Sequence, residues 1–408
     1  MMGLGACDRE TQSPKLPASP AATAPPIDEK AAEKFLEHHW ARPLAPQGKI
    51  HESTAAQGIS LAPESCASCH ASQFQDWRNS LHSKAMGPGI MGQLVVMPAH
   101  ARGDHQACIR CHAPLAEQAD SLVAAIKQAK QQRLPAGGTG GLHSQGLVCA
   151  ACHVRQQEWH GPPRRDGSEL SSEAKNYPHG GWKANRAFES SQFCAACHQF
   201  KDDEYALNGK LLENTYREWQ DSRYARQGVS CQACHMPDRR HLWKGIHDAE
   251  TVKKGIEIRT GAAAMANEQL SAKISVGNSG VGHYFPTYVT PKVVVHGFQQ
   301  DAAGHKLEGT EQLFIIGRQV SLDITKEIAD TRIAPDAEAS FDYRAPRHQS
   351  ATALMWQVEI QPDAFYLEFY RELLKYPTKG EGKRLIIEAR DHASTSPYIV
   401  FSKSLALP

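Results

Sequence analysis

Five copies of the pentapeptide Cys-x-x-Cys-His account for ten of the eleven cysteines in this chain of 408 residues. The copies are Cys66-Ala-Ser-Cys69-His70, Cys108-Ile-Arg-Cys111-His112, Cys149-Ala-Ala-Cys152-His153, Cys194-Ala-Ala-Cys197-His198 and Cys231-Gln-Ala-Cys234-His235. In a c-type haem site the two thiols add across the haem vinyl groups, and the histidine that follows becomes an axial ligand of the iron. The motifs therefore predict five covalently attached haems, each with its motif histidine as the proximal ligand.

Two other uses of paired cysteines explain this pattern less well. A zinc site needs two CxxC units, or one unit with two distant histidines, and does not require a histidine directly after the second cysteine. A disulfide framework also leaves the repeated histidine unexplained. The haem interpretation uses every cysteine except Cys7.

The residue on the other side of each iron decides between an electron carrier and a catalyst. Sixteen of the 21 histidines lie outside the motifs. A lone histidine is more often a surface or hydrogen-bonded residue than a ligand, so each candidate needs support from its context. The candidates for the distal positions are His82, His143, His160, His179, His247 and His283.

Helical geometry restricts which iron two of these candidates can reach. His82 follows His70 by twelve residues, which is about 18 Å on a continuous helix, whereas two axial nitrogens on one iron are about 4 Å apart. His82 must therefore serve a different haem. His153 and His160, about 10 Å apart if they share one helical face, would also ligate neighbouring irons.

The other candidates lie in loops. His143 follows a glycine-rich segment, and His179 lies in a Tyr-Pro-His-Gly-Gly sequence whose rigid and small residues let the backbone approach a flat cofactor. His247 is followed by an aspartate that would orient its ring, and His241 is its nearest competitor. His283, in a glycine-rich link between two expected strands, would let the C-terminal region supply a ligand.

Methionine is the other common distal ligand, and it raises the reduction potential. Thioether candidates are Met86, Met91, Met97 and Met236. The abundance of histidine favours coordination of most irons by two histidines, and hence low potentials.

Composition divides the chain into three parts. Residues 1–27 contain Leu4-Gly-Ala-Cys7, which resembles a lipoprotein cleavage site, followed by a proline-rich linker. Because only six residues precede Cys7, too few for a signal peptide, an unmodified cysteine in a tail is the alternative. We expect residues 28–255 to form a pentahaem domain in which the haems supply much of the core. We expect residues 256–408 to form a β-sandwich, and this part contains no haem motif.

The predicted fold class is therefore α+β, with a mainly helical and loop-rich haem domain followed by an Ig-like β-sandwich. Apolar periodicity predicts helices at 28–40, 115–134, 214–226 and 363–375. It predicts strands at 270–276, 292–298, 313–322, 339–343, 355–360, 384–389 and 398–404.

Charge and hydropathy argue against nucleic-acid binding and against a membrane-spanning helix. The polypeptide has a formal charge of +1, and the haem propionates would bring it to about −4 when oxidised and about −9 when reduced. The basic surface expected of a nucleic-acid-binding protein is absent. No apolar run approaches the length of a membrane-spanning helix. Because haems of this type are attached outside the bacterial inner membrane, we expect the protein in the periplasm or on the outer cell surface, with lipidated Cys7 as its possible membrane anchor.

Several of these segments resemble the multihaem cytochromes related to cytochrome c-554 of nitrifying bacteria, a superfamily that includes hydroxylamine oxidoreductase and pentahaem nitrite reductase. The resemblance covers about residues 63–250 and rests on the first motif, the segment Trp77–His82 and the sequence Gly-Val-Ser-Cys-Gln-Ala-Cys-His-Met-Pro at 228–237. It implies haems in stacked and perpendicular pairs, with His82 ligating a second haem. The sequence Gly-His-x-x-Pro-Thr at 282–287 is similar to one in exported multihaem cytochromes with a C-terminal β-domain, where its histidine is a haem ligand.

The chain also departs from two members of that superfamily. Pentahaem nitrite reductases usually hold the catalytic haem through CxxCK, whereas all five motifs here end in histidine. Hydroxylamine oxidoreductases carry more haems and a tyrosine crosslinked to the active one, and no matching tyrosine is present. The resemblance therefore implies a fold and a cofactor but no substrate.

The sequence predicts a carrier that passes electrons between redox partner proteins, without a catalytic acid or base. The alternative is an oxidoreductase that acts on a small nitrogen or sulfur oxyanion at a five-coordinate haem, where His100, Arg102 and His105 would supply charge and protons. A haem-stabilised binding module is a third, weaker interpretation, because five haems exceed what stability requires. A monomer, an oligomer and a filament all remain open.

Overall fold

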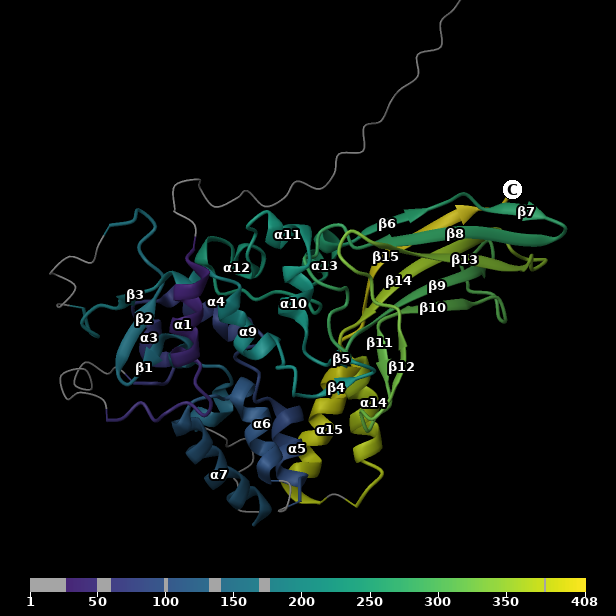
Figure 1. Ribbon diagram of the computed structural model, residues 1–408. Helices are drawn as coiled ribbons and strands as arrows, with labels where there is room; N and C mark the ends of the chain where they lie inside the picture. Colours follow the sequence, from purple (N-terminus) through teal and green to yellow (C-terminus); the bar gives the residue numbers. More distant parts are fainter. Residues whose placement is uncertain (1–26, 50–59, 99–101, 132–140, 169–176, 378) are drawn as a thin grey trace, which may run out of the picture.

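The structure is a computed structural model that describes residues 27–49, 60–98, 102–131, 141–168, 177–377 and 379–408. Cys7, the sequence around it and nearly all of the proline-rich linker lie outside the described residues. The described elements form two regions, one made of short helices that carry the motifs and one made of long strands (Figure 1). The predicted combination of a helical motif region with a C-terminal sheet region is confirmed.

Short helices make up most of the motif region. They are α1 (Glu29–His39), α3 (Glu64–Ala67), α4 (Ala71–Asn79), α5 (Pro88–Val96), α6 (Arg102–His112), α7 (Ala116–Lys130), α8 (Cys149–His153), α9 (Gln192–His198), α10 (Thr215–Gln220), α11 (Arg223–Arg226), α12 (Cys231–His235) and α13 (Ala249–Gly255). Between them lie the short strands β1 (Val154–Arg155), β2 (Glu158–Gly161), β3 (Lys183–Ala184), β4 (Ala206–Leu207) and β5 (Lys210–Leu211).

Capping residues explain where several of these helices begin. The Asp28 carboxylate accepts hydrogen bonds from the amides of Lys30 and Ala31 at the start of α1. The helices expected at 28–40 and 115–134 are confirmed as α1 and α7. The helix expected at 214–226 is instead divided into α10 and α11, because the Ser222 hydroxyl caps a new helix by accepting from the Ala225 amide.

Long strands form two sheets in the C-terminal region. The first contains β6 (Glu257–Thr260), β7 (Ala264–Ala266), β8 (Gln269–Gly277) and β13 (Glu338–Pro346), in the order β13-β8-β6 with β7 also paired to β8. The second contains β9 (Lys292–Gln300), β10 (Gln312–Ile316), β14 (Ala353–Gln361) and β15 (Tyr398–Ala406), in the order β10-β9-β14-β15. A small hairpin pairs β11 (Arg318–Val320) with β12 (Glu327–Asp330).

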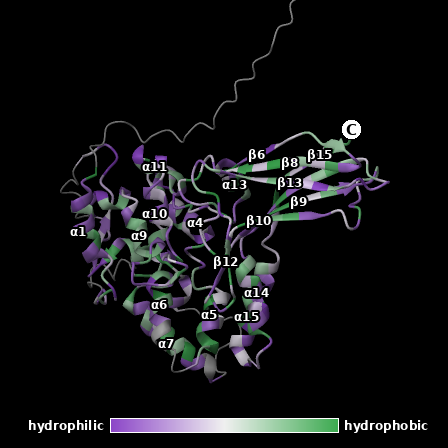
Figure 2. Cartoon of the chain, turned by 45° about the vertical axis from the view of Figure 1, so that its right-hand side comes forward, coloured by the Kyte–Doolittle hydropathy of each residue, from purple (hydrophilic) through white to green (hydrophobic). Residues whose placement is uncertain are grey.

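The two large sheets share one hydrophobic core. Leu270 and Ile274 of β8 pack there with Trp356 and Val358 of β14, and all four side chains are fully or almost fully buried. Burial alternates residue by residue along β14, as expected for a strand with one face toward a core. Hydrophobic and hydrophilic residues accordingly alternate along these strands in Figure 2.

Most of the predicted strands are confirmed, because 270–276, 292–298, 339–343, 355–360 and 398–404 lie in β8, β9, β13, β14 and β15. The strand expected at 384–389 is wrong, since this segment lies in the helix α15 (Gly380–Ser394). Leu385 and Ala389 are buried one helical turn apart, while Arg384 pairs with Glu381 and Glu388 on the exposed side. The buried residues therefore follow the spacing of a helix, although the short apolar run resembled a strand. The strand expected at 313–322 is divided between β10 and β11, which belong to different sheets.

Two C-terminal helices return to the motif region. α14 (Ala364–Leu373) confirms the helix expected at 363–375. α14 packs on α15, and α15 lies beside α5 (Figure 1). A Cβ atom on Gly92 of α5 would lie 2.7 Å from Cδ1 of Ile386, so the two helices approach as closely as glycine allows. No helix in the described part of the chain is long and apolar enough to cross a membrane.

Candidate functional site

One large cavity in the motif region is lined by all ten motif cysteines and all five motif histidines. Its volume is about 4430 Å³, whereas a pocket for one drug-sized ligand has about 300–1000 Å³. The cavity therefore has room for several large, flat groups. Aromatic residues such as Phe74, Trp77 and Phe188 also line it, which suits an apolar macrocycle.

Each motif forms about one helical turn, which brings its three reactive side chains together. α8 and α12 consist of the motif residues alone, and α6 and α9 end with the motif histidine. In a helix, residues three and four positions apart lie on one face. Both thiols and the imidazole of a motif therefore face the cavity from one short element.

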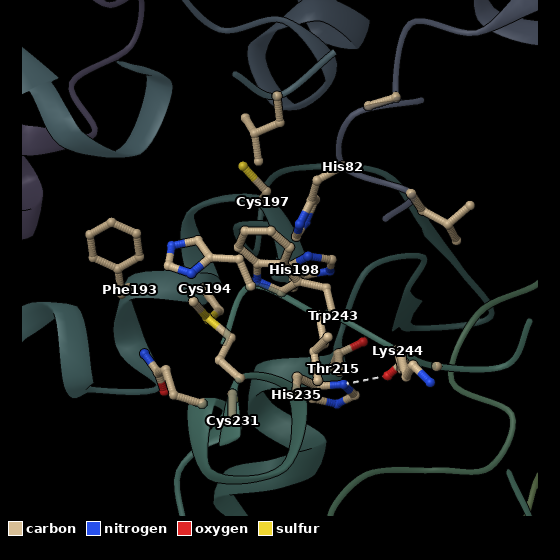
Figure 3. Close-up of a pocket in the computed structure, with 18 of the residues that line it drawn as sticks. His82, Phe193, Cys194, Cys197, His198, Thr215, Cys231, His235, Trp243 and Lys244 are labelled. Atoms are coloured by element: carbon tan, nitrogen blue, oxygen red, sulfur yellow. Dashed lines mark hydrogen bonds between the residues drawn. The ribbon is translucent and has the colours of Figure 1, made fainter. Parts of the chain in front are cut away.

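Cysteines of different motifs also lie in contact. A hydrogen bond from Cys149 lowers the pKa of the Cys66 thiol to about 7, and one from Cys197 does the same for Cys111. Cys194 and Cys231 form a third such pair, seen in Figure 3. The first motif is thus beside the third, the second beside the fourth and the fourth beside the fifth.

Four of the motif histidines face a second histidine ring across the cavity. Two imidazoles bound to one iron have nitrogens about 4 Å apart, and hence ring centroids about 6.3 Å apart. The four pairs, with their centroid distances, are His70 and His179 at 6.5 Å, His82 and His198 at 6.3 Å, His153 and His241 at 6.2 Å, and His235 and His283 at 6.4 Å. These separations fit two histidines on one iron.

Hydrogen bonds orient most of these rings. Among the motif histidines, His153 and His235 each donate Nδ1–H to a main-chain carbonyl oxygen at 2.8 Å. Among the facing residues, His179 donates to Gly181 at 2.7 Å and His283 to Tyr284 at 2.9 Å. Such a bond places the proton on Nδ1 and leaves the Nε2 lone pair available to a metal.

Burial favours the neutral, iron-binding form of the buried paired rings. It lowers the pKa of His82 to about 3, and those of His153, His198 and His283 to about 4. Neutral imidazole is the ligating form. The cavity, the paired rings and their protonation together fit haem c, whose iron would supply reversible one-electron chemistry when bound.

The structure places the predicted distal candidates in two groups. His82, His179 and His283 each face a motif histidine, which is His198, His70 and His235 respectively; Figure 3 shows His82 and His198. His82 is therefore not opposite His70, in agreement with the helix argument.

The other three candidates have different surroundings. His160 lies on β2, so the expected helix from His153 is wrong, and its carbonyl oxygen rather than its ring meets His153. His143 is hydrogen-bonded to the Ser121 hydroxyl and is not among the described cavity-lining residues. His247 lies near the Asp363 carboxylate, with Nε2–O distances of 3.1 Å.

His241, the competitor of His247 in the sequence analysis, is the one of the two that faces a motif histidine. Asp76 on α4 explains this, because its carboxylate accepts two hydrogen bonds of 2.6 Å from the Arg240 guanidinium and one of 3.1 Å from the His241 amide. The Arg240 contact lowers the pKa of Asp76, which stays ionised. Nothing in the local sequence near His241 indicated this contact.

Replacing Asp76 with alanine is expected to weaken the position of His241. Three hydrogen bonds to a nearly buried carboxylate are lost, at a cost of about 1–3 kcal/mol. Thermal unfolding checks the loss of stability, and the high-spin fraction in the visible spectrum checks the ligand. Unchanged spectra and an unchanged unfolding temperature would contradict the positioning role.

His112 differs from the other motif histidines. Its Nδ1 is 2.6 Å from the Ala85 carbonyl oxygen, so its ring is oriented as a ligand. Each of the other four motif histidines faces a second histidine ring. In the described part of the chain, no such ring pair includes His112. A haem at the second motif therefore has one histidine ligand in the described structure.

The remaining candidates that the structure describes have other surroundings. Met86 and Met91 are buried in a hydrophobic cluster, whereas Met236 lines the cavity, beside its own motif histidine. His100 lies outside the described residues, Arg102 begins α6, and His105 is not among the described residues that line the cavity. Met97 ends α5.

Comparisons with known proteins agree with this geometry. Residues 65–133 match the family model described as cytochrome c554 and c-prime. Cytochrome c-554 of Nitrosomonas europaea is 24% identical over 155 residues, which are 36% of this chain and 60% of that protein. A penta-heme cytochrome c552 from Thermochromatium tepidum has a similar fold, with a TM-score of 0.57 and 17% identity over 85% of this chain and 99% of that one. Motifs that share one cavity with facing histidines, together with these similarities, support a multihaem c-type cytochrome.

Proposed function

We propose that the chain carries five haems c and passes electrons between redox partner proteins outside the inner membrane. One observation supports this most strongly: four motif histidines stand opposite a second histidine at the separation required by an iron between them. An iron with two histidine ligands has no open position for substrate, so it exchanges electrons without chemistry. Neighbouring motifs in contact would keep the haems close enough for rapid transfer.

The finer parts of the proposal concern domains and location. Residues 28–255 would form the pentahaem domain and 256–408 an Ig-like β-sandwich that supplies His283. The protein would reside in the periplasm or on the outer cell surface. Cys7, if lipidated, would attach it to a membrane through the linker.

Mass spectrometry and redox titration test the proposal together. The intact holoprotein should have the mass of the chain plus five haems, and Cys-to-Ser replacement of both cysteines in one motif should remove one. A titration followed by visible absorption should span a wide range of low potentials. Fewer than five attached haems in protein matured by a competent host would reject the haem count.

A second candidate function rests on His112. An open iron position would bind a small nitrogen or sulfur oxyanion, which the neighbouring haems would supply with electrons. Glu213 is a suitable proton donor nearby, since burial raises its pKa to about 8 and one of its oxygens is buried without a hydrogen-bond partner. Glu213 lines the same cavity as Cys111 and His112 of the second motif.

Electron paramagnetic resonance separates the two functions. We expect the oxidised protein to show low-spin signals from four haems and a high-spin signal from the haem at His112. Added nitrite or hydroxylamine should change only the high-spin signal if the second candidate is correct. Five low-spin haems, or a high-spin signal insensitive to these ligands, would leave electron transfer as the function.

A further inference from the structure

His198 is held differently from the other motif histidines. For His112, His153 and His235, Nδ1 is bonded to the main-chain carbonyl oxygen of Ala85, His160 and Lys244 respectively. The Nδ1 atom of His198 instead lies 2.6 Å from the phenolic oxygen of Tyr288. A hydroxyl accepts one hydrogen bond and donates another, so Tyr288 can pass the interaction onward.

The hydrogen bonds continue from Tyr288 through two threonines. The Tyr288 hydroxyl is hydrogen-bonded to Thr215, the first residue of α10. The hydroxyl oxygens of Thr215 and Thr287 are 2.7 Å apart. The Thr287 hydroxyl then donates to the Glu218 carboxylate at 3.1 Å. We call this series from His198 to Glu218 the hydrogen-bond chain.

Every donor in the hydrogen-bond chain can point the same way. The carboxylate accepts from Thr287, which leaves Thr287 to accept from Thr215, Thr215 from Tyr288, and Tyr288 from Nδ1–H of His198. A series aligned in this way polarises each of its members. Aligned in this way, the hydrogen-bond chain would couple the His198 imidazole to the Glu218 carboxylate.

Arg332 fixes the far end of the hydrogen-bond chain. Its guanidinium donates to Glu218 at 2.9 Å and to the Thr287 carbonyl oxygen at 2.7 Å. Burial raises the pKa of Glu218, while Arg332 and the Tyr284 amide stabilise its ionised form. The carboxylate side chain is only 3% exposed, so solvent does not screen it.

We propose that Tyr288, Thr215, Thr287 and Glu218 lower the reduction potential of the haem ligated by His198 through the hydrogen bond at its Nδ1. They are positioning residues, because they act through the imidazole and do not contact the iron. A hydrogen bond accepted from Nδ1–H makes the imidazole a better electron donor than a ring without one, which stabilises the ferric form. The inference rests on the proposed attachment of a haem at the fourth motif.

The loop that carries Tyr288 also carries His283. His283, which faces His235, is five residues before Tyr288 in the same loop. The C-terminal region thus supplies a ligand to one site and controls the ligand of the next. Motifs four and five are also in contact through Cys194 and Cys231.

Tyr288→Phe in the intact holoprotein tests the proposal. Phenylalanine keeps the ring and removes the acceptor of Nδ1–H. The midpoint potential of one haem should rise, with a change of up to about tenfold in its reduction equilibrium, which is about 59 mV for one electron. Thr287→Val should shift the same haem in the same direction by less. Redox titration with resonance spectra taken at set potentials measures both, and the low-spin signal of that haem should change its g values.

Tyr366→Phe is the matched control, since Tyr366 is a buried tyrosine that lines the same cavity outside the hydrogen-bond chain. It should leave every potential unchanged. Unaltered potentials in Tyr288→Phe, or an equal shift in the control, would overturn the inference. If Tyr288→Phe failed to load its haems, Thr287→Val and Thr215→Val would decide. A native protein without a haem at the fourth motif would instead reject the proposed haem count.

Discussion

Replacing His283 with alanine is expected to convert one low-spin haem into a high-spin haem while all haems stay attached. His283 faces His235 with ring centroids 6.4 Å apart and planes inclined by 13°. Its Nδ1 bond to the Tyr284 carbonyl oxygen presents Nε2 to the cavity. Alanine removes this ligand but not the thioether bonds of the fifth motif, so the haem count by mass should not change.

Resonance and visible spectra of the oxidised protein measure the change, and added imidazole should restore a low-spin signal by filling the vacated position. His247→Ala is the matched control. His247 also lines the cavity, but its ring nitrogen faces the Asp363 carboxylate. High-spin haem in the control and none in His283→Ala would show that the ligand pairing is wrong.

The grouping of each motif's two thiols and imidazole could be predicted from the sequence because it depends on local spacing. Two cysteines and a histidine within five residues remain neighbours whatever the rest of the chain does. Helix geometry likewise excluded His82 as the partner of His70 without knowledge of the fold. The glycine-rich surroundings of His179 and His283 predicted loops that approach a cofactor, and both rings face a motif histidine.

The choice between His241 and His247 could not be made from the sequence. The aspartate after His247 was expected to orient the ring, yet Asp248 caps α13 by accepting from the Thr251 amide at 2.8 Å. His241 is placed by Arg240 and Asp76, which are 164 residues apart. Such a contact has no local signature, because it exists only after α4 and the segment after α12 have come together.

The strand expected at 384–389 was wrong for a related reason. Its apolar residues match a short strand as well as one face of a helix, and only the surroundings distinguish the two. The helical face is used because α15 packs against Gly92 of α5. The two-sheet core, by contrast, was predicted well, since alternating burial over nine residues is specific to strands.

Replacing Arg332 with alanine is expected to lower the free energy of unfolding by about 3–5 kcal/mol, because it leaves the buried Glu218 carboxylate without its cation. Arg332 and Glu218 are 6% and 3% exposed, and Arg332 also pairs with Asp330 at 2.9 Å. The Nη1 group that donates to Glu218 also donates to the Thr287 carbonyl oxygen, at 2.7 Å. Denaturant unfolding of the holoprotein measures the loss, and Arg371→Ala provides the control. Arg371 forms an exposed pair with Glu368, whose removal should cost at most about 1 kcal/mol.

Arg332→Ala should also affect the haem at the fifth motif. Glu218 accepts from the Tyr284 amide and the Thr287 hydroxyl, so it anchors the segment between His283 and Tyr288. Loss of Arg332 should therefore raise the high-spin fraction of the haem at the fifth motif, whereas Arg371→Ala should not. Adding Glu218→Gln to Arg332→Ala should recover part of the stability, because a neutral amide is cheaper to bury than an unpaired carboxylate. A double variant as unstable as Arg332→Ala alone would mean that the arginine acts by packing and not by neutralising Glu218.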